Sequence, residues 1–130
     1  MIIAIDGTTA SGKGTIAKRL AARYRLPHMD TGRLYRATAV AAIKQGIALD
    51  DAAGLAAIAA SIDLADFEET DLRTGEAGKA ASRVAVVPEV RQALFDLQRA
   101  FATQPRGALL DGRDSGTVIA PDADVKLWVD

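Results

Sequence analysis

The amino-acid sequence predicts an α/β fold in which a parallel sheet is flanked by helices. Short runs of β-branched or apolar residues alternate with longer segments of helical periodicity, which is typical of strands joined by crossover helices. The 130 residues are 49% hydrophobic, enough for one compact core. We therefore expect a single domain over residues 1–130.

The charge balance and the cysteine count exclude several classes of protein. With 16 basic and 17 acidic side chains, the chain has no broad positive field for a nucleic acid or an anionic membrane. We therefore expect no nucleic-acid partner and no membrane partner. The sequence has no cysteine, which excludes disulfides and thiolate metal sites. It has one histidine, His28. We expect a monomer in the reducing cytoplasm.

The first half of the chain shows the alternation in order. Residues 2–6 form a buried-strand pattern, and residues 13–25 place their apolar side chains on one helical stripe. A brief strand is predicted at 28–30, after a helix-breaking proline, and a helix follows over 33–45. Gly46 then stands where helices commonly end in a left-handed residue.

The second half is less regular. Asp50 has the character of a helix N-cap before an alanine-rich helix over 51–61. Residues 62–67 predict a strand, and a polar stretch with two glycines and mixed charge follows at 68–79. The remaining elements are a helix that Pro88 begins, a strand, a loop and a last strand, predicted at 88–103, 108–111, 112–117 and 123–129.

A glycine-rich motif follows the first predicted strand and opens the first predicted helix. Residues 7–13 match G-x-x-x-x-G-K in the strand-to-helix context that a P-loop requires; the alternative is a glycine-rich turn with an incidental lysine. Backbone N–H groups of such a loop surround phosphate oxygens, and Lys13 can reach the terminal phosphates of ATP. The predicted ATP-binding residues are Gly7, Thr8, Thr9, Ala10, Ser11, Gly12, Lys13, Gly14 and Thr15.

Further segments indicate what receives the phosphoryl group. They are Asp30-Thr31-Gly32, Leu34-Tyr35-Arg36, Ala80-Ala81-Ser82, Arg91 and the loop Asp111-Gly112-Arg113-Asp114-Ser115-Gly116-Thr117. In this order, and with the P-loop before them, they resemble bacterial cytidylate kinases from residue 2 to residue 130. The Asp-Gly-Arg-Asp loop is the most specific part of this resemblance.

The resemblance implies a substrate site for CMP or dCMP. Arg36 and Arg113 would bind the acceptor phosphate, and arginine suits this role because its planar fork donates two N–H groups to phosphate oxygens. Thr31 and Tyr35 would line the acceptor pocket, although Tyr35 equally fits a core position. By the same resemblance, the residues that recognise the cytosine would be Ser82, Arg91 and Asp114; without it, Arg36, Ser82 and Arg91 also fit solvent-exposed helix faces.

A metal site is expected beside the phosphates. Asp111 ends an apolar strand, where P-loop enzymes keep an acidic residue that orients Mg²⁺ directly or through water; the alternative is a helix N-cap. Gly14 stands where the motif usually has a hydroxyl for Mg²⁺, and Thr15 supplies one a residue later. His28 is expected to be structural and Trp128 to be a core residue.

The chain also differs in two ways from the family that it resembles. The segment around 62–87 is a shortened form of an insert that covers the monophosphate site in the family with a small sheet. Family members continue past the strand near residue 129 with an arginine-rich lid and a C-terminal segment. The chain thus resembles the N-terminal part of such a kinase, with a P-loop NTPase-like sheet truncated after the fourth core strand. We expect it to be less active and less stable than a longer member.

The expected function is phosphoryl transfer from ATP to CMP or dCMP, giving CDP or dCDP and ADP, with Mg²⁺ as cofactor. The acceptor phosphate is already anionic, so the catalytic groups Lys13, Arg36 and Arg113 would position two polyanions and neutralise charge. One alternative is another small-molecule P-loop kinase, against which the Asp-Gly-Arg-Asp loop argues. The other is a nucleotide-binding module without catalysis.

Overall fold

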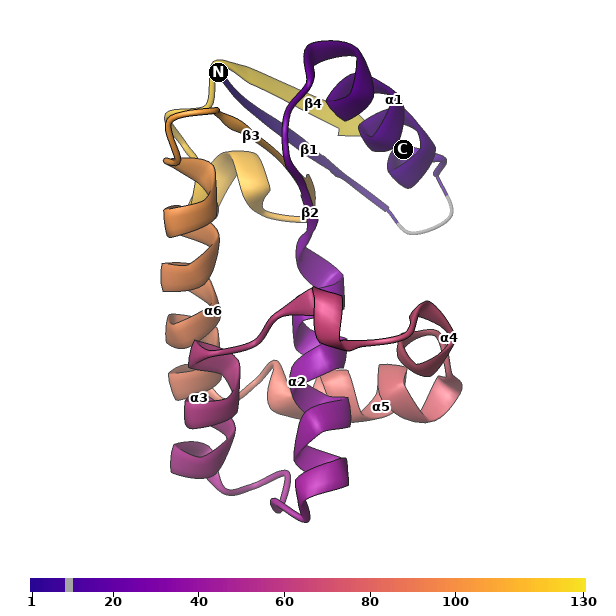
Figure 1. Ribbon diagram of the computed structural model, residues 1–130, viewed down its shortest axis with the longest axis vertical. Helices are drawn as coiled ribbons and strands as arrows, with labels where there is room; N and C mark the ends of the chain where they lie inside the picture. The colour runs from indigo at the N-terminus through magenta and orange to yellow at the C-terminus, as the bar shows by residue number, and fades with distance from the viewer. Residues whose placement is uncertain (9–10) are drawn as a thin grey trace. The chain divides into compact units, whose positions relative to one another are not determined.

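The computed structural model describes residues 1–8 and 11–130 and confirms the α/β fold with a parallel sheet (Figure 1). In chain order its elements are β1 Ile2–Gly7, α1 Lys13–Tyr24, β2 His28–Asp30, α2 Thr31–Gln45, α3 Ala52–Ala60, the 3₁₀ turn η1 Leu64–Asp66, α4 Glu69–Leu72, α5 Gly75–Val84, α6 Pro88–Ala102, β3 Ala108–Gly112, the π-helical turn η2 Ser115–Ile119 and β4 Val125–Val129.

Two compact units make up the chain, and each is described by itself. Unit 1 comprises Met1–Thr31 together with Gln98–Asp130, and unit 2 comprises Gly32–Leu97. Unit 1 holds the whole sheet, whereas unit 2 is helical. Among the described residues, no helix is both long enough and apolar enough to span a membrane.

The sheet of unit 1 has the strand order β2-β3-β1-β4, with every neighbouring pair parallel. Figure 1 shows β4 beside β1, at the edge of the sheet. The order places β1 and β3 at the centre, where five consecutive residues of each strand are buried. The core on one face of this sheet combines strand and α1 residues, namely Ile3, Ile5, Ala17, Ala21 and Leu109, with Leu20, Leu26 and Val129 packed around them.

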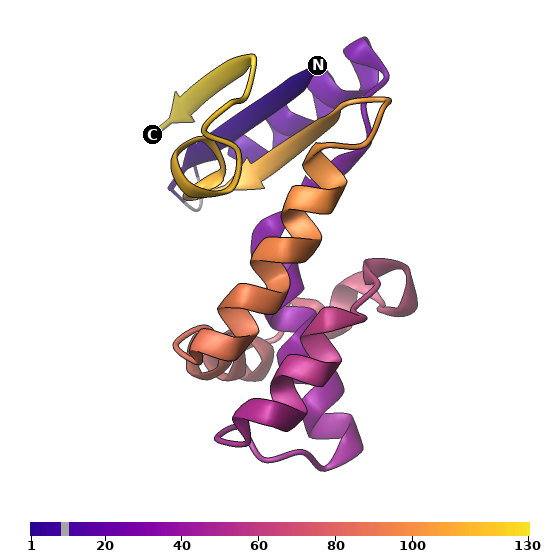
Figure 2. The ribbon, with the colours of Figure 1, turned by 90° about the vertical axis from the view of Figure 1, so that its left-hand side faces the viewer.

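Strand alternation decides which face each carboxylate occupies at the end of the central strands. Ile5 pairs in register with Asp111, and Asp6 pairs with Gly112. Because side chains alternate along a strand, Asp111 shares the α1 face with Ile5, and Asp6 points to the opposite face. Figure 2 shows η2 as a single coil beside the sheet, in the same unit.

Unit 2 consists of α2 from residue 32 onward, α3, η1, α4, α5 and the part of α6 up to residue 97. Alanine makes up much of its interior, which lets helix backbones approach closely. The side chains of Asp51, Asp63 and Thr74 accept backbone N–H groups at the starts of α3, η1 and α5, over 3.0, 2.9 and 3.0 Å. The buried apolar residues of this unit include Leu34, Ala37, Ala39, Ala42, Leu55, Ala59, Leu72, Ala77, Ala80, Ala81, Val84, Val90 and Leu94.

Several sequence expectations are confirmed, and two in unit 2 are wrong. The strand expected at 62–67 is absent, because the Asp63 side chain binds the N–H of Ala65 and begins the turn η1 instead. The cap of α3 is Asp51 and not Asp50, a shift of one residue. The polar stretch 68–79 forms α4 and the start of α5.

Trp128 is not a core residue, contrary to expectation. It lies on β4, and 62% of it is exposed. The first four residues of this strand are all exposed, because β4 forms the edge of the sheet beyond β1. Apolar character alone does not separate an edge strand from a central one.

Candidate functional site

The P-loop lies in unit 1, directly after β1. Gly12 caps α1 with φ +85°, a left-handed conformation that favours glycine. A Cβ on Gly7 would lie 2.0 Å from the carbonyl oxygen of Val129, so β1 and β4 approach too closely there for a side chain. The Ser11 hydroxyl donates to the carbonyl of Thr8 over 2.7 Å. The predicted ligands Thr9 and Ala10 lie outside the described residues.

Lys13 and Asp111 meet where the P-loop enters α1. The Lys13 ammonium binds Oδ1 of Asp111, and Nε2 of His28 binds Oδ2 of the same carboxylate. Burial alone would raise the pKa of the Asp111 carboxyl, but hydrogen bonds from His28 and Lys13 outweigh burial and hold that pKa below the ordinary value of 3.8. The carboxylate is therefore ionised and only 1% exposed.

The predicted pocket residue Thr31 lies against the end of β3. Its hydroxyl donates to the carbonyl of Asp111 over 3.1 Å, and the residue is 6% exposed. A Cβ on Gly112 would lie 2.1 Å from that hydroxyl oxygen, so glycine is needed there. Thr31 thus fixes the backbone that carries Asp111.

These groups fit a magnesium ion shared with phosphates. Mg²⁺ in such sites takes one or two carboxylates, water and phosphate oxygens, and Asp111 offers one ionised carboxylate beside the P-loop. Thr15 is exposed in the first turn of α1. Within residues 1–8 and 11–130, no three His, Asp or Glu side chains are grouped to hold a metal ion by themselves.

The predicted acceptor residues Arg113 and Asp114 follow β3 in unit 1. Arg113 is exposed and Asp114 is partly buried. The chain then turns through η2, whose N–H groups at Val118 and Ile119 both donate to the carbonyl of Asp114, over 2.9 and 3.2 Å. The loop is therefore a closed turn with its two charged side chains at the start.

Arg36 lies in unit 2, where α4 holds its guanidinium by a hydrogen bond and α5 lies against it. Its Nη1 donates to the carbonyl of Leu72, the last residue of α4, over 2.7 Å. A Cβ on Gly78 of α5 would lie 3.2 Å from Nη2, so the glycine makes room for the guanidinium. One turn earlier on α2, Arg33 pairs with Glu69, the first residue of α4, over 2.5 Å. Both ends of α4 are thereby tied to α2.

Ser82 and Arg91 are exposed, and in this structure both bind backbone of unit 2. The Ser82 hydroxyl donates to the carbonyl of Gly78 over 3.2 Å, one turn earlier in α5. Arg91 donates to the carbonyl of Ala85 over 3.4 Å. Tyr35 is half-buried on α2. The predicted acceptor residues are thus divided between the two units, and each set is positioned within its own unit.

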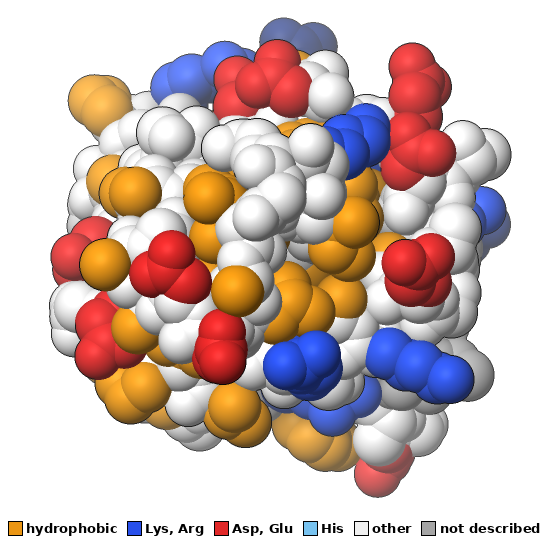
Figure 3. All heavy atoms as spheres, turned by 90° about the horizontal axis from the view of Figure 1, so that it is seen from below, with side chains coloured by type: hydrophobic (Ala, Val, Ile, Leu, Met, Phe, Trp, Pro, Cys, Tyr) orange, Lys and Arg blue, Asp and Glu red, His pale blue; other side chains and the backbone are white. Residues whose placement is uncertain are grey.

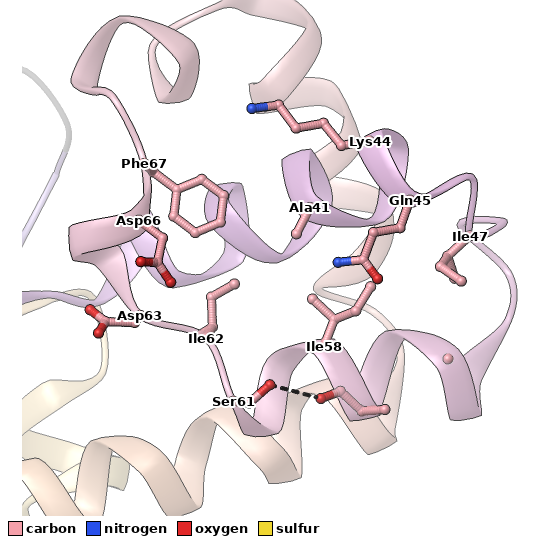
Figure 4. Close-up of a pocket in the computed structure, with 12 residues that line it drawn as sticks. Ala41, Lys44, Gln45, Ile47, Ile58, Ser61, Ile62, Asp63, Asp66 and Phe67 are labelled. Atoms are coloured by element: carbon pink, nitrogen blue, oxygen red, sulfur yellow. Dashed lines mark hydrogen bonds between the residues drawn. The ribbon is translucent and has the colours of Figure 1, made fainter.

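Unit 2 also contains a pocket that no sequence pattern predicted (Figure 4). It has a volume of about 630 Å³ and is lined by residues of α2, of α3 and of the segment around η1, among them Lys44, Ile58, Asp63 and Phe67. None of the predicted site residues lines it. Figure 3 shows the molecule from below. Hydrophobic side chains lie on the face seen there, with acidic and basic side chains among them.

The parallel sheet, the P-loop motif and the Lys13–Asp111 pair place the chain in the P-loop class of α/β proteins. Comparison with known proteins identifies the family: the cytidylate kinase family model matches residues 3–130, and the chain belongs to this family. The cytidylate kinase of Methylocella silvestris is 60% identical over 129 residues, which are 99% of this chain and 60% of that protein.

Cytidylate kinases of other bacteria match the chain to a similar extent. The cytidylate kinase of a Bradyrhizobium strain is 57% identical over 99% of this chain and 61% of its own length. That of Rhodospirillum rubrum is 55% identical over 99% of this chain and 62% of its own length. The chain thus spans about three fifths of the length of the curated relatives it matches.

Two contacts of the site were not foreseen from the sequence. His28 was expected to be structural, and its ring binds the carboxylate expected to orient Mg²⁺. Asp6 belongs to none of the motifs, yet its carboxylate accepts the N–H groups of Ser115 and Gly116, directly after Arg113 and Asp114. An acidic residue at the end of an apolar strand was the available signal for Asp6, because a buried carboxylate requires partners.

Proposed function

We propose that the protein transfers the γ-phosphoryl group of ATP to CMP or dCMP, giving ADP and CDP or dCDP. The observation that carries the proposal is the pairing of Lys13 with Asp111 at the P-loop, in a chain of the cytidylate kinase family. The contact between an ammonium group and an ionised carboxylate supports the proposal, because the first would neutralise phosphate oxygens and the second would bind a metal ion. We further propose that the protein acts as a monomer in the cytoplasm, which the absence of cysteine suits.

On the donor side, the chain binds and neutralises the triphosphate. The P-loop N–H groups and the N-terminus of α1 would surround the phosphates, and the Lys13 ammonium would move from Asp111 to the terminal phosphate oxygens. Asp111 and Thr15 would hold Mg²⁺, which supplies charge neutralisation at the phosphates. His28 stays on the other oxygen of Asp111 and keeps the carboxylate oriented when Lys13 leaves.

On the acceptor side, arginines would hold the monophosphate. Arg36 and Arg113 would donate pairs of N–H groups to its oxygens, and Thr31 and Tyr35 would line the acceptor pocket. No general base is needed, because the attacking phosphate oxygen is already anionic. Catalysis would consist of alignment and charge neutralisation.

The base would be recognised by matched donors and acceptors. Cytosine presents an amino donor at N4 and acceptors at N3 and O2; Asp114 and Ser82 can accept from N4, and Arg91 can donate to the ring acceptors. Uracil places a carbonyl oxygen opposite the Asp114 carboxylate and an N–H opposite the guanidinium of Arg91. Uracil is then rejected by repulsion as well as by lost hydrogen bonds.

A coupled assay of ADP release tests the proposal, with ATP and Mg²⁺ present and with CMP, UMP or no acceptor added. We expect ADP release to depend on CMP and kcat/KM for CMP to exceed that for UMP by at least tenfold, since each mismatched buried polar group costs about 1–3 kcal/mol. Asp114→Asn should reduce this preference, because an amide can turn its NH₂ group toward O4 of uracil.

The assay also separates the alternatives. ADP release that depends on a different acceptor would identify another small-molecule kinase. ATP binding without ADP release for any acceptor would identify a nucleotide-binding module. Unchanged selectivity in Asp114→Asn would remove Asp114 from base recognition.

A further inference from the structure

Asp6 is a buried charged residue that the proposed reaction does not use. It ends β1 and is 7% exposed. Its Oδ1 accepts the N–H of Ser115 over 2.7 Å, and its Oδ2 accepts the N–H of Gly116 over 2.8 Å. Both distances are typical of charge-assisted hydrogen bonds, which are about twice as strong as neutral ones.

The face on which Asp6 lies separates its task from that of Asp111. The two carboxylates stand on neighbouring strands in register, but Asp111 points to the α1 face with Lys13, and Asp6 points to the face of η2. Asp6 therefore does not compete for the P-loop lysine. Its two oxygens are directed at the first two N–H groups of η2, which have no partner within that turn.

The loop between β3 and η2 is fixed at both ends. Gly112 ends β3 in register with Asp6, and Ser115 and Gly116 are held by the Asp6 carboxylate. Arg113 and Asp114 are the two residues between these anchors. With both flanks attached to the central strands, these two residues have little freedom to change their backbone direction.

The far end of η2 has a separate anchor. Arg99 of α6 donates to the carbonyl of Ile119 over 3.0 Å and to Asp122 over 2.8 Å. That anchor lies after the turn, whereas Asp6 holds its beginning, next to the two predicted acceptor residues. Loss of the Asp6 contacts would release the functional part of the loop while η2 remained attached at its other end.

We propose that Asp6 is a positioning residue, whose carboxylate holds the Ser115 and Gly116 N–H groups so that Arg113 and Asp114 face the acceptor nucleotide. This inference rests on the proposed function for the identity of the acceptor. A carboxylate suits the task because its two oxygens accept from two consecutive N–H groups at once. An asparagine has one carbonyl oxygen and turns an NH₂ group toward the second N–H, and glutamate carries the same oxygens one carbon further out.

The test compares Asp6→Asn and Asp6→Glu with Asp124→Asn. Asp124 is a matched control, because its carboxylate also accepts a backbone N–H in unit 1, that of Ile2 over 2.7 Å, but at the start of β1. For each protein we would measure amide hydrogen exchange at residues 115 and 116 and the Kd values of CMP and of ATP with Mg²⁺.

We expect Asp6→Asn to speed exchange at both amides by about tenfold or more and to raise the Kd of CMP by about tenfold, the equivalent of one charge-assisted hydrogen bond. The Kd of ATP should change by less than about twofold, and Asp124→Asn should leave both CMP affinity and the two amides unchanged. Asp6→Glu should restore part of the protection and part of the CMP affinity.

Faster exchange with unchanged CMP affinity would overturn the inference and leave Asp6 as a purely structural anchor. An equal loss of ATP and CMP affinity would overturn it as well, since it would place the effect on the P-loop. If Asp6→Asn does not fold, the inference is tested on the unaltered protein by amide hydrogen exchange. CMP should slow exchange at residues 115 and 116 severalfold, and ATP alone should not. Equal protection of these amides by both nucleotides would contradict the inference.

The proposed function can fail separately. If the unaltered protein binds ATP but no CMP, the acceptor has been misidentified. The exchange measurement at residues 115 and 116 still shows whether Asp6 holds the loop, and the affinity comparison is then made with the acceptor that the ADP-release assay identifies.

Discussion

In unit 1 the candidate residues Lys13 and Asp111 bind each other through their side chains, whereas in unit 2 Arg36 and Ser82 bind backbone carbonyl groups. Lys13, His28 and Asp111 form one group around the buried Asp111 carboxylate. Removing Lys13 or His28 leaves that carboxylate with one of its two donors, and removing Asp111 takes the partner from both. Arg36 and Ser82 instead bind carbonyl oxygens of Leu72 and Gly78. The difference indicates that changes in unit 1 alter stability and ligand binding together, while changes in unit 2 alter binding with little effect on stability.

The largest expected effect is that of Lys13→Ala, which breaks the unit 1 group and removes the phosphate-binding cation. We expect phosphoryl transfer to fall by at least about a hundredfold, since the charge that develops in the transition state loses a neutralising cation. Thermal unfolding should also occur at a lower temperature, because Asp111 loses one of its two donors. Lys18→Ala, an exposed change on the same helix, is the control for both measurements. Normal turnover in Lys13→Ala would contradict the P-loop assignment.

Asp111→Asn tests whether the Asp111 carboxylate contributes to the free energy of unfolding in a pH-dependent way. Because the pKa of Asp111 is lowered in the folded state, its contribution to stability is present above the unfolded value of about 3.9 and is lost as the pH falls through the folded pKa. We expect Asn to cost about 1–3 kcal/mol at pH 7 and to remove this part of the acid-induced loss. Urea unfolding of both proteins between pH 3 and pH 7 measures the difference in their free energies of unfolding. Parallel stability curves for the two proteins would show that the group is not coupled to folding.

Arg36→Lys sharpens the comparison from the side of unit 2. An ammonium cannot reproduce a two-pronged contact with phosphate, so we expect CMP affinity to fall by about tenfold while the unfolding temperature changes little. Calorimetric titration with CMP and with ATP measures the two affinities, and a thermal scan measures the unfolding temperature. Arg113→Lys, in unit 1, should have a similar effect on CMP. Equal weakening of ATP binding would make these arginines general electrostatic elements.

The smallest expected effect is that of Gly78→Ala. The new methyl group would stand 3.2 Å from Nη2 of Arg36, and the flexible guanidinium can shift to relieve the contact. We expect CMP affinity to fall by roughly twofold to fivefold, with ATP affinity unchanged. Gly75→Ala is the matched control in the same helix, since a Cβ there meets nothing within 4 Å. Identical behaviour of the two variants would show that the place of Arg36 does not depend on Gly78.

The sequence by itself determined the strand, P-loop and helix at the N-terminus, because strand periodicity, glycine spacing and the motif lysine are local properties. It also determined the parallel sheet, through the alternation of strands and helices, and the family, through motifs in a fixed order. The roles of Arg36, Ser82, Arg91, Arg113 and Asp114 remain predictions, since they concern contacts with nucleotides.

Only the tertiary structure decided which side chains meet. Lys13 and Asp111 are 98 residues apart in sequence, and Asp6 and Ser115 are 109 apart, so no local pattern relates them. The strand order made β4 an edge and left Trp128 exposed, although its sequence is as apolar as that of a buried strand. At 62–67 the turn η1 replaced the expected strand because the Asp63 side chain binds the N–H of Ala65, and such local side-chain caps compete with strand pairing until packing decides.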